Sequence, residues 1–157
     1  AYIVERDGTI YEVFPPECWA YHLKIGASNE RRSIGIEVGS EGGLLYRGGK
    51  YYCFDRVSER TEFKGKVFDF GKLWRRQYRY FAAYTLAQVK SIKILVDYLL
   101  HTYNIPPVVP KNLYMYNPKL KLFAGILGHH HVRADKTDVH PGFKWQEFIN
   151  ELGLHRM

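Results

Sequence analysis

The sequence predicts a single α/β domain in which helices flank a mixed β-sheet and a large aromatic-rich insertion interrupts the pattern. Strand-like and helix-like segments are mixed along the chain, which is typical of such domains. The chain has 157 residues, a length that suits one domain with one core. Its composition, 46% hydrophobic and 25% charged, is that of an ordinary globular protein. We therefore treat residues 1–157 as one domain.

The first elements are strands. Residues 1–14 (AYIVERDGTIYEVF) alternate into the turn signal Asp7-Gly8, and a second β-rich run follows, which predicts a hairpin. Because a domain rarely begins within a hairpin, we expect sequence upstream of Ala1 to be missing from this chain. Residues 33–40 (SIGIEVGS) then predict a short buried strand.

Residues 44–82 form the predicted insertion. They contain eleven aromatic residues and show no helical period. Ten lysines and arginines stand against four aspartates and glutamates, so this segment holds nearly all of the chain's net charge of +7.

The later segments predict two helices and a strand. The clearest helix runs from Thr85, a plausible N-cap, to Tyr103, and Asn104 with Pro106 ends it. Its apolar residues have helical spacing: Val89, Ile92, Val96, Leu99 and Tyr103. Residues 121–127 (KLFAGIL) are a strand candidate, and residues 143–152 predict a short closing helix.

The charge points to an anionic partner. Lysine and arginine exceed aspartate and glutamate by seven, and the isoelectric point is near 9.4. Such a surface suits a nucleic acid or a negatively charged polymer of a cell wall or membrane. No apolar run reaches the length of a membrane span, the first residues lack a signal-peptide layout, and Cys18 and Cys53 are too few for a disulfide framework.

Residues 128–143 (GHHHVRADKTDVHPGF) are the first candidate for chemistry. Imidazole nitrogen and carboxylate oxygen are zinc ligands, and a catalytic zinc site takes three protein ligands. His129 follows the predicted strand directly, and Asp138 lies nine residues later on a loop that can fold back. Since neighbouring strand residues face opposite sides, at most His129 and His131 share a face, and we expect one ligand from the three histidines.

Two charged residues have competing interpretations. Lys136, two residues before Asp138, is either a solvated loop lysine or a cation that stabilises an oxyanion beside a metal. Glu37 ends the apolar run SIGIE, where a carboxylate without a partner would be costly. It is either held in a structural salt bridge or placed in a cavity at the strand's end as a general base.

The order of the motifs resembles a known family. The series runs YIVERDGTIYEVF, WAYH (19–22), Asn29, SIGIE (33–37), YTLAQ (84–88), YNIP, GH (128–129), K-x-D (136–138) and FKW (143–145). It resembles the type 2 N-acetylmuramoyl-L-alanine amidases, whose fold is shared by phage lysozymes of the amidase type and peptidoglycan recognition proteins. The resemblance covers essentially the whole chain outside the insertion.

The resemblance implies a set of site residues. It places metal ligands at His129 and Asp138, and catalytic groups at Glu37 and Lys136. The family's first zinc ligand is a histidine on a strand that would lie upstream of Ala1, so no residue of this chain is assigned to it.

The resemblance also implies substrate contacts, with differences from the family. His22 and Asn29 match loop residues beside the substrate groove, although Tyr21 replaces the usual Trp-His adjacency. The family's D-P-G is D-V-H-P-G here, which adds His140 near the site, on the substrate side or as a structural residue. In the insertion, four aromatic residues either stack on sugars or pack the insertion onto the domain: Tyr51, Tyr52, Trp74 and Tyr78.

The implied function is zinc-dependent cleavage of peptidoglycan at the amide between N-acetylmuramic acid and L-alanine. The protein would then act on the cell wall as an endolysin or cell-wall amidase, whether secreted, periplasmic or phage-delivered. A non-catalytic peptidoglycan-binding module of the same fold is the alternative. A nucleic-acid partner is suggested by residues 75–81 (RRQYRYF), which mix cations with aromatic rings, but it gives no account of Glu37, His129, Lys136 and Asp138. We therefore expect no nucleic acid and no membrane insertion.

Overall fold

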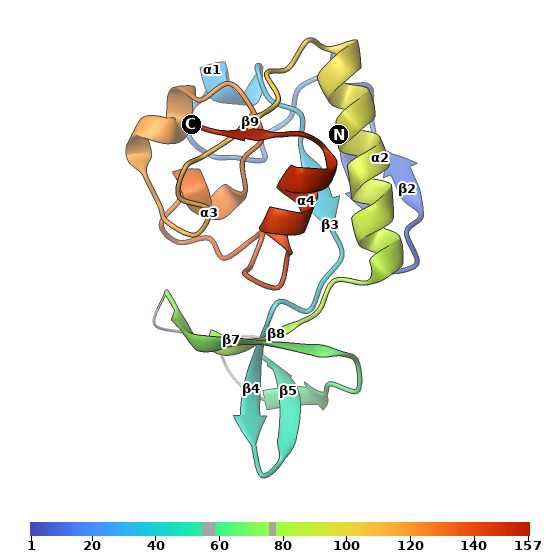
Figure 1. Ribbon diagram of the computed structural model, residues 1–157, viewed down its shortest axis with the longest axis vertical. Coiled ribbons are helices and arrows are strands. Elements are labelled where there is room, and N and C mark those ends of the chain that lie inside the picture. The colour runs from blue at the N-terminus through green and yellow to red at the C-terminus, as the bar shows by residue number, and fades with distance from the viewer. Residues whose placement is uncertain (55–58, 76–77) are drawn as a thin grey trace.

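The computed structural model describes residues 1–54, 59–75 and 78–157, and it is an α/β structure (Figure 1). Parts of the predicted insertion and of the RRQYRYF segment, residues 55–58 and 76–77, lie outside the described residues. In chain order the elements are β1 (Tyr2–Val4), β2 (Ile10–Glu12), α1 (Ala27–Glu30), β3 (Ile36–Val38), β4 (Gly43–Arg47), β5 (Lys50–Phe54), β6 (Glu59–Glu62), β7 (Val67–Trp74), β8 (Tyr78–Ala82), α2 (Leu86–Thr102), β9 (Val108–Val109), the 3-10 helix η1 (Pro118–Leu122), α3 (His129–Val132), α4 (Trp145–Glu151) and β10 (His155–Arg156).

The part of the structure outside strands β4 to β8, which we call the body, contains a mixed three-stranded sheet, as predicted. Its order is β2-β1-β3, with β1 antiparallel to β2 and parallel to β3. The hairpin turns at Asp7-Gly8, where Gly8 has a positive φ of 90° and Thr9 donates its N–H to the Asp7 carboxylate at 2.8 Å. Glycine takes this backbone conformation without steric cost, so the turn signal in the sequence works as expected.

Helix α2 confirms the clearest sequence prediction. The Thr85 hydroxyl accepts the Gln88 N–H at 3.0 Å, and the Gln88 side chain accepts the Thr85 N–H at 3.1 Å, which forms a capping box. Each apolar side chain that the helix buries contributes roughly 1.5–3 kcal/mol. The buried apolar face consists of Ile92, Leu95, Val96, Leu99 and Leu100.

The core lies between α2, β1 and the closing helix α4. Tyr2 and Val4 of β1 are buried against α2, and Trp145, Phe148 and Ile149 of α4 join the same cluster. Helix α4 therefore confirms the predicted closing helix. In the described chain no helix is both long and apolar enough to cross a membrane.

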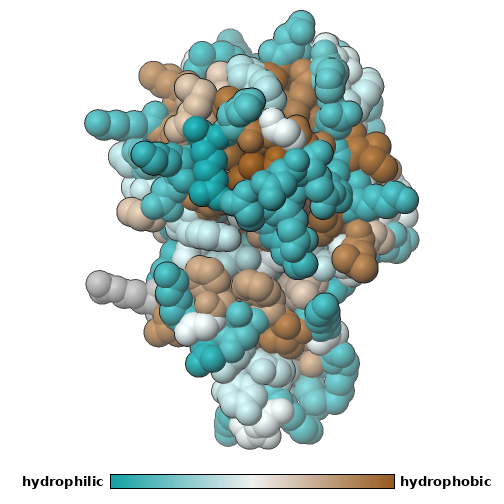
Figure 2. Space-filling model, viewed as in Figure 1, coloured by the Kyte–Doolittle hydropathy of each residue, from teal (hydrophilic) through white to brown (hydrophobic). Residues whose placement is uncertain are grey.

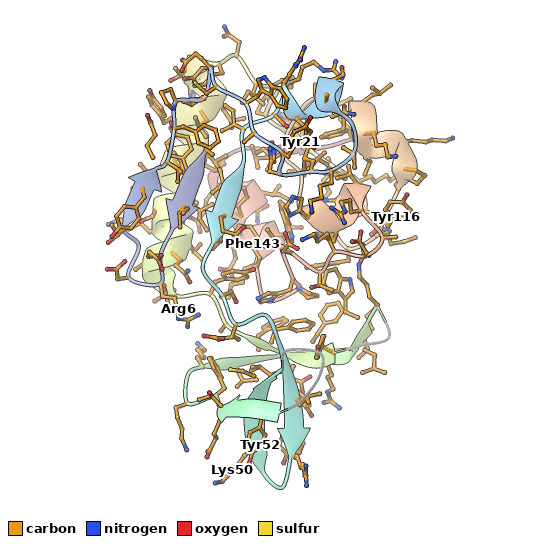
Figure 3. All side chains as sticks on the ribbon, turned by 180° about the vertical axis from the view of Figure 1, so that it is seen from behind. Arg6, Tyr21, Lys50, Tyr52, Tyr116 and Phe143 are labelled. Carbon is orange, nitrogen blue, oxygen red and sulfur yellow. The ribbon has the colours of Figure 1, made fainter. Side chains whose placement is uncertain are left out.

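Strands β4 to β8 form a separate five-stranded antiparallel sheet, which we call the lobe. Its order is β6-β5-β4-β8-β7, and it projects below the body in Figure 1. Figure 3 shows Lys50 and Tyr52 at the far end of the lobe, opposite Tyr21. The lobe joins the body through buried aromatic residues: the Trp74 indole N–H donates to the Tyr114 carbonyl at 3.1 Å, and Phe81 is fully buried.

Two segments differ from the sequence prediction. The strand expected over residues 121–127 is wrong, because Pro118–Leu122 form η1 and the chain then continues without regular structure. Asn117 caps η1 by accepting the Lys119 N–H at 3.0 Å, and proline at the first position favours a helical start. The histidine run likewise forms the short helix α3 and does not follow a strand. The expected sharing of a face by His129 and His131 on a strand is therefore wrong as well.

Candidate active site

His129 and Asp138 are in direct contact. The Nδ1 atom of His129 meets the Oδ2 atom of Asp138, and the Asp138 carbonyl accepts the His130 backbone N–H at 2.9 Å. The loop after α3 thus folds back, as the sequence predicted. The His129 side chain is 19% exposed and the Asp138 side chain 51%, so the pair opens to solvent on the side of the carboxylate.

The second ring nitrogen of His129 is fixed by the backbone. Its Nε2 atom lies 2.9 Å from the carbonyl oxygen of His22. Because a carbonyl only accepts, Nε2 carries a hydrogen, and loss of the Nδ1 proton would leave on Nδ1 the lone pair that a metal binds. Carbonyl partners of this kind commonly orient metal-binding histidines.

The pKa values of the pair are shifted in opposite directions. The hydrogen bond that His129 donates to the Asp138 carboxylate raises the pKa of His129 above its ordinary value. Burial works to raise the pKa of Asp138, but the hydrogen bond and charge of His129, with the charge of Lys136, hold that pKa below its usual range. Without a metal the pair is thus stabilised as an imidazolium and a carboxylate.

The donor atoms fit two positions of a metal site. A neutral imidazole nitrogen and a carboxylate oxygen that converge are a usual zinc donor pair. Among the residues that the structure describes, no group of three or more His, Cys, Asp or Glu side chains could hold a metal ion. His129 and Asp138 could therefore supply two of the protein ligands that such a site needs.

The other two histidines of the run are buried and point elsewhere. The Nε2 atom of His130 lies 3.0 Å from the Leu113 carbonyl, and its Nδ1 atom lies 3.1 Å from the Asp138 carbonyl. His131 accepts the Gly128 N–H on Nδ1 at 2.9 Å, and burial lowers its pKa to about 3. These rings hold the backbone around His129, and only His129 meets the carboxylate of Asp138.

Glu37 and Lys136 lie in the same region. Glu37 sits on β3 opposite Ile3, its side chain is exposed, and it lines the same cavity as His129 and Asp138. The expectation of a carboxylate on a buried strand is corrected here, because β3 is only half-buried. Lys136 lies two residues before Asp138, and its charge contributes to the pKa shifts of both His129 and Asp138.

The cavity has a volume of about 740 Å³. On the face shown in Figure 2, apolar side chains are visible in the upper body within a frame of hydrophilic ones. Among the described strands, β3 pairs only with β1, so the other edge of β3 has no strand partner. The apolar lining includes Ile36, Val38, Ile92, Val96, Leu99, Ile126, Trp145 and Phe148.

His22 and Asn29 lie on the polar wall of this cavity. The Nε2 atom of His22 is 3.1 Å from the Ser33 hydroxyl. The Asn29 side-chain amide donates to the Ile25 carbonyl at 3.2 Å. Both side chains therefore shape the loop beside His129 through local hydrogen bonds.

His140 and Trp74 are buried, which favours the structural alternative that the sequence left open for each of them. His140 is 3% exposed and stacks between Phe81 at 4.9 Å and Tyr84 at 4.5 Å. It accepts the Gly142 N–H on Nδ1, and burial lowers its pKa to about 3. Trp74 is 6% exposed and packs against His130. Neither ring has a free face, because the junction of lobe and body covers both.

Arg75 is a residue whose role sequence reasoning missed. Its guanidinium donates to the carbonyls of His130, Arg133 and Ala134, the last at 2.5 Å, and so caps the C-terminal end of α3. In the sequence it belongs to a basic run that predicts solvated side chains, so no signal marked it. Glu30 was missed for the same reason, since it stands among charged loop residues.

These features define an α/β domain that brings a histidine and two carboxylates to one cavity, a set suited to hydrolysis assisted by a metal. A family model described as N-acetylmuramoyl-L-alanine amidase matches residues 1–142 of the 157-residue chain. The chain therefore belongs to the N-acetylmuramoyl-L-alanine amidase family, whose substrate is peptidoglycan. Comparison with curated proteins and with solved structures found no significant match.

Proposed function

We propose that the protein is a zinc-dependent peptidoglycan hydrolase that cleaves the amide between the lactyl group of N-acetylmuramic acid and L-alanine. The observation that carries the proposal is the contact of His129 with Asp138, with the His129 ring oriented by the His22 carbonyl. Membership in the amidase family supports the same substrate. The protein then acts on the cell wall as an endolysin or cell-wall amidase, after secretion, in the periplasm or by phage delivery.

The chain's own residues divide the chemistry among them. His129 and Asp138 would hold the zinc ion, which would supply Lewis acidity toward the scissile carbonyl and the attacking water. Glu37, exposed in the same cavity, accepts the proton of the attacking water and returns it to the leaving amine. The Lys136 ammonium, two residues before Asp138, balances the negative charge of the tetrahedral intermediate.

We infer in addition that the third protein ligand comes from a β-strand upstream of Ala1. The support is local: the open edge of β3 offers unpaired backbone groups, and the apolar cavity beside it has room for a strand's side chains. A histidine on such a strand would complete the three protein ligands that catalytic zinc sites use.

Cobalt substitution tests this ligand set. The full-length protein loaded with Co²⁺ should show the intense visible absorption of a four-coordinate ion, and His129→Ala should abolish it. Weak absorption of the six-coordinate type in the unsubstituted protein would contradict three protein ligands.

Peptide release from purified peptidoglycan tests the activity. We expect the zinc-loaded full-length protein to release stem peptides, and Glu37→Gln to lower kcat by roughly 10²–10⁴-fold. Glu147→Gln, an exposed glutamate on α4, is the matched control and should keep full activity. Binding of peptidoglycan without any release by the zinc-loaded protein would establish the non-catalytic alternative instead.

A further inference from the structure

A fully buried carboxylate holds the loop beside His129. Glu30, the last residue of α1, has no exposed surface, yet carboxylates are rarely buried without partners. Its Oε2 atom accepts the backbone N–H groups of His22 at 2.9 Å and Leu23 at 3.0 Å, and Oε1 accepts that of Lys24 at 2.6 Å. Three N–H donors directed at one carboxylate compensate the charge and fix three successive residues of the loop.

The loop held by Glu30 contacts the candidate metal ligand. His22 donates its N–H to Glu30, and its carbonyl faces Nε2 of His129 at 2.9 Å. The path from the buried carboxylate to the imidazole therefore runs through a single residue. A shift of His22 would change both the position of the carbonyl and the orientation of the His129 ring.

Among the described residues, few other polar contacts reach the backbone of residues 22–24. Lys24 has a φ of 55°, in the left-handed region that is unfavourable for a residue with a side chain. The Arg133 guanidinium adds a long contact to the Leu23 carbonyl at 3.4 Å. The shortest polar contacts to the backbone of residues 22–24 are those of Glu30 and His129.

Among the residues that the structure describes, the hydrogen-bond partners of the Glu30 side chain all lie within this loop. Besides the three N–H groups, its carboxylate lies 3.2 Å from Nδ1 of His22. Its partners are thus the residues that lead to His129, and they lie outside the hydrophobic core formed by α2, β1 and α4. Loss of the carboxylate would release the loop first.

We propose that Glu30 is a positioning residue of the active site: by fixing residues 22–24 it holds the His22 carbonyl that orients His129, and it thereby sets the affinity of the site for a divalent metal. This inference rests on the proposed metal site at His129 and Asp138. It assigns to a loop glutamate a role that neither its position in the sequence nor direct contact with substrate would suggest.

The variant Glu30→Gln tests the inference, because glutamine keeps the size but replaces one acceptor oxygen with an NH₂ group that opposes the loop donors. Two readouts are needed in the full-length protein. Amide hydrogen exchange of His22, Leu23 and Lys24, measured without metal, should accelerate at least tenfold. The dissociation constant for Zn²⁺ alone should rise about 10–100-fold, the range for outer partners of metal ligands.

Controls separate the possible failures. Glu147→Gln removes an exposed glutamate of α4 and should change neither readout. Faster exchange in Glu30→Gln with an unchanged zinc affinity would overturn the positioning role and leave Glu30 as a loop anchor only. Zinc binding that is insensitive to His129→Ala would instead overturn the proposed metal site.

A second variant tests the inference in case the first variant does not fold. If Glu30→Gln fails to fold, Glu30→Asp keeps the charge but shortens the reach to the loop, and it carries the same two readouts. Weaker zinc binding together with faster exchange in Glu30→Asp supports the inference, and zinc affinity equal to that of the unsubstituted protein refutes it.

Discussion

At the scale of single residues, His140 should make the folded protein less stable as the pH falls. It is buried between Phe81 and Tyr84, and burial lowers its pKa from 6.5 to about 3. As the pH falls below 6.5, this histidine binds a proton in the unfolded chain but stays neutral in the folded protein. The folded state therefore has its full stability above pH 6.5 and loses stability as the pH falls toward 3. We expect the free energy of unfolding to fall by up to about 1.4 kcal/mol per pH unit from this residue.

Denaturant titrations between pH 7 and pH 4 measure this slope of the free energy of unfolding against pH. His140→Phe keeps an aromatic ring in the stack and should show a shallower dependence than the unsubstituted protein. His101→Phe replaces an exposed histidine of α2 and should keep the original slope. An identical slope for the unsubstituted protein and His140→Phe would show that His140 does not remain neutral in the folded state.

At this scale the sequence was informative where the chemistry depends on the spacing of residues within one segment. The nine-residue separation of His129 and Asp138 allows the loop to fold back, the resemblance implied that the two residues act together, and their side chains do meet. The sequence alone could not show that His140 and Trp74 are buried, because their burial depends on how the lobe packs onto the body. Glu30 was equally hidden, since its three partners are backbone groups that any residue carries.

At the scale of elements, Arg75 links the lobe to helix α3. Its guanidinium donates to three carbonyls at the end of that helix, and hydrogen bonds from a charged donor are worth roughly 1.5–3 kcal/mol. We expect Arg75→Ala to lower the free energy of unfolding by about 2 kcal/mol, measured by urea titration. The control Arg79→Ala removes an exposed ion pair with Asp69, which is worth roughly 1 kcal/mol or less. Equal losses in the two variants would contradict the role of Arg75.

Local signals determined which elements the sequence could predict. The hairpin and α2 were predicted because a turn dipeptide and a capping residue act on their immediate neighbours. Residues 121–127 were not, because a short apolar run fits a buried strand or an irregular segment equally well, and the cap at Asn117 lies outside the run. The helical turn at His129 was not predicted, for a related reason. The His131 ring accepts the Gly128 N–H, and no residue pattern indicates this contact.

At the scale of the whole molecule, the distribution of charge predicts how the protein meets its substrate. Residues 44–82 of the sequence have a surplus of six positive charges out of a net +7, and strands β4 to β8 of this region form the lobe that projects from the body (Figure 1). Bacterial cell walls are anionic, so attraction should raise the rate of encounter and weaken as salt is added. The lobe, with most of the surplus, should make the larger contribution.

Two double variants with the same change in charge test this. Lys66→Gln with Lys72→Gln removes two exposed cations of the lobe, and Lys90→Gln with Lys111→Gln removes two exposed cations of the body. We expect the lobe variant to lose several-fold more affinity for isolated cell walls at low salt, measured by co-sedimentation, and the difference to vanish near 1 M salt, where screening reaches about 3 Å. Equal losses in both variants would mean that only the net charge of the protein attracts it to the wall, and that the lobe has no preferred role in wall binding.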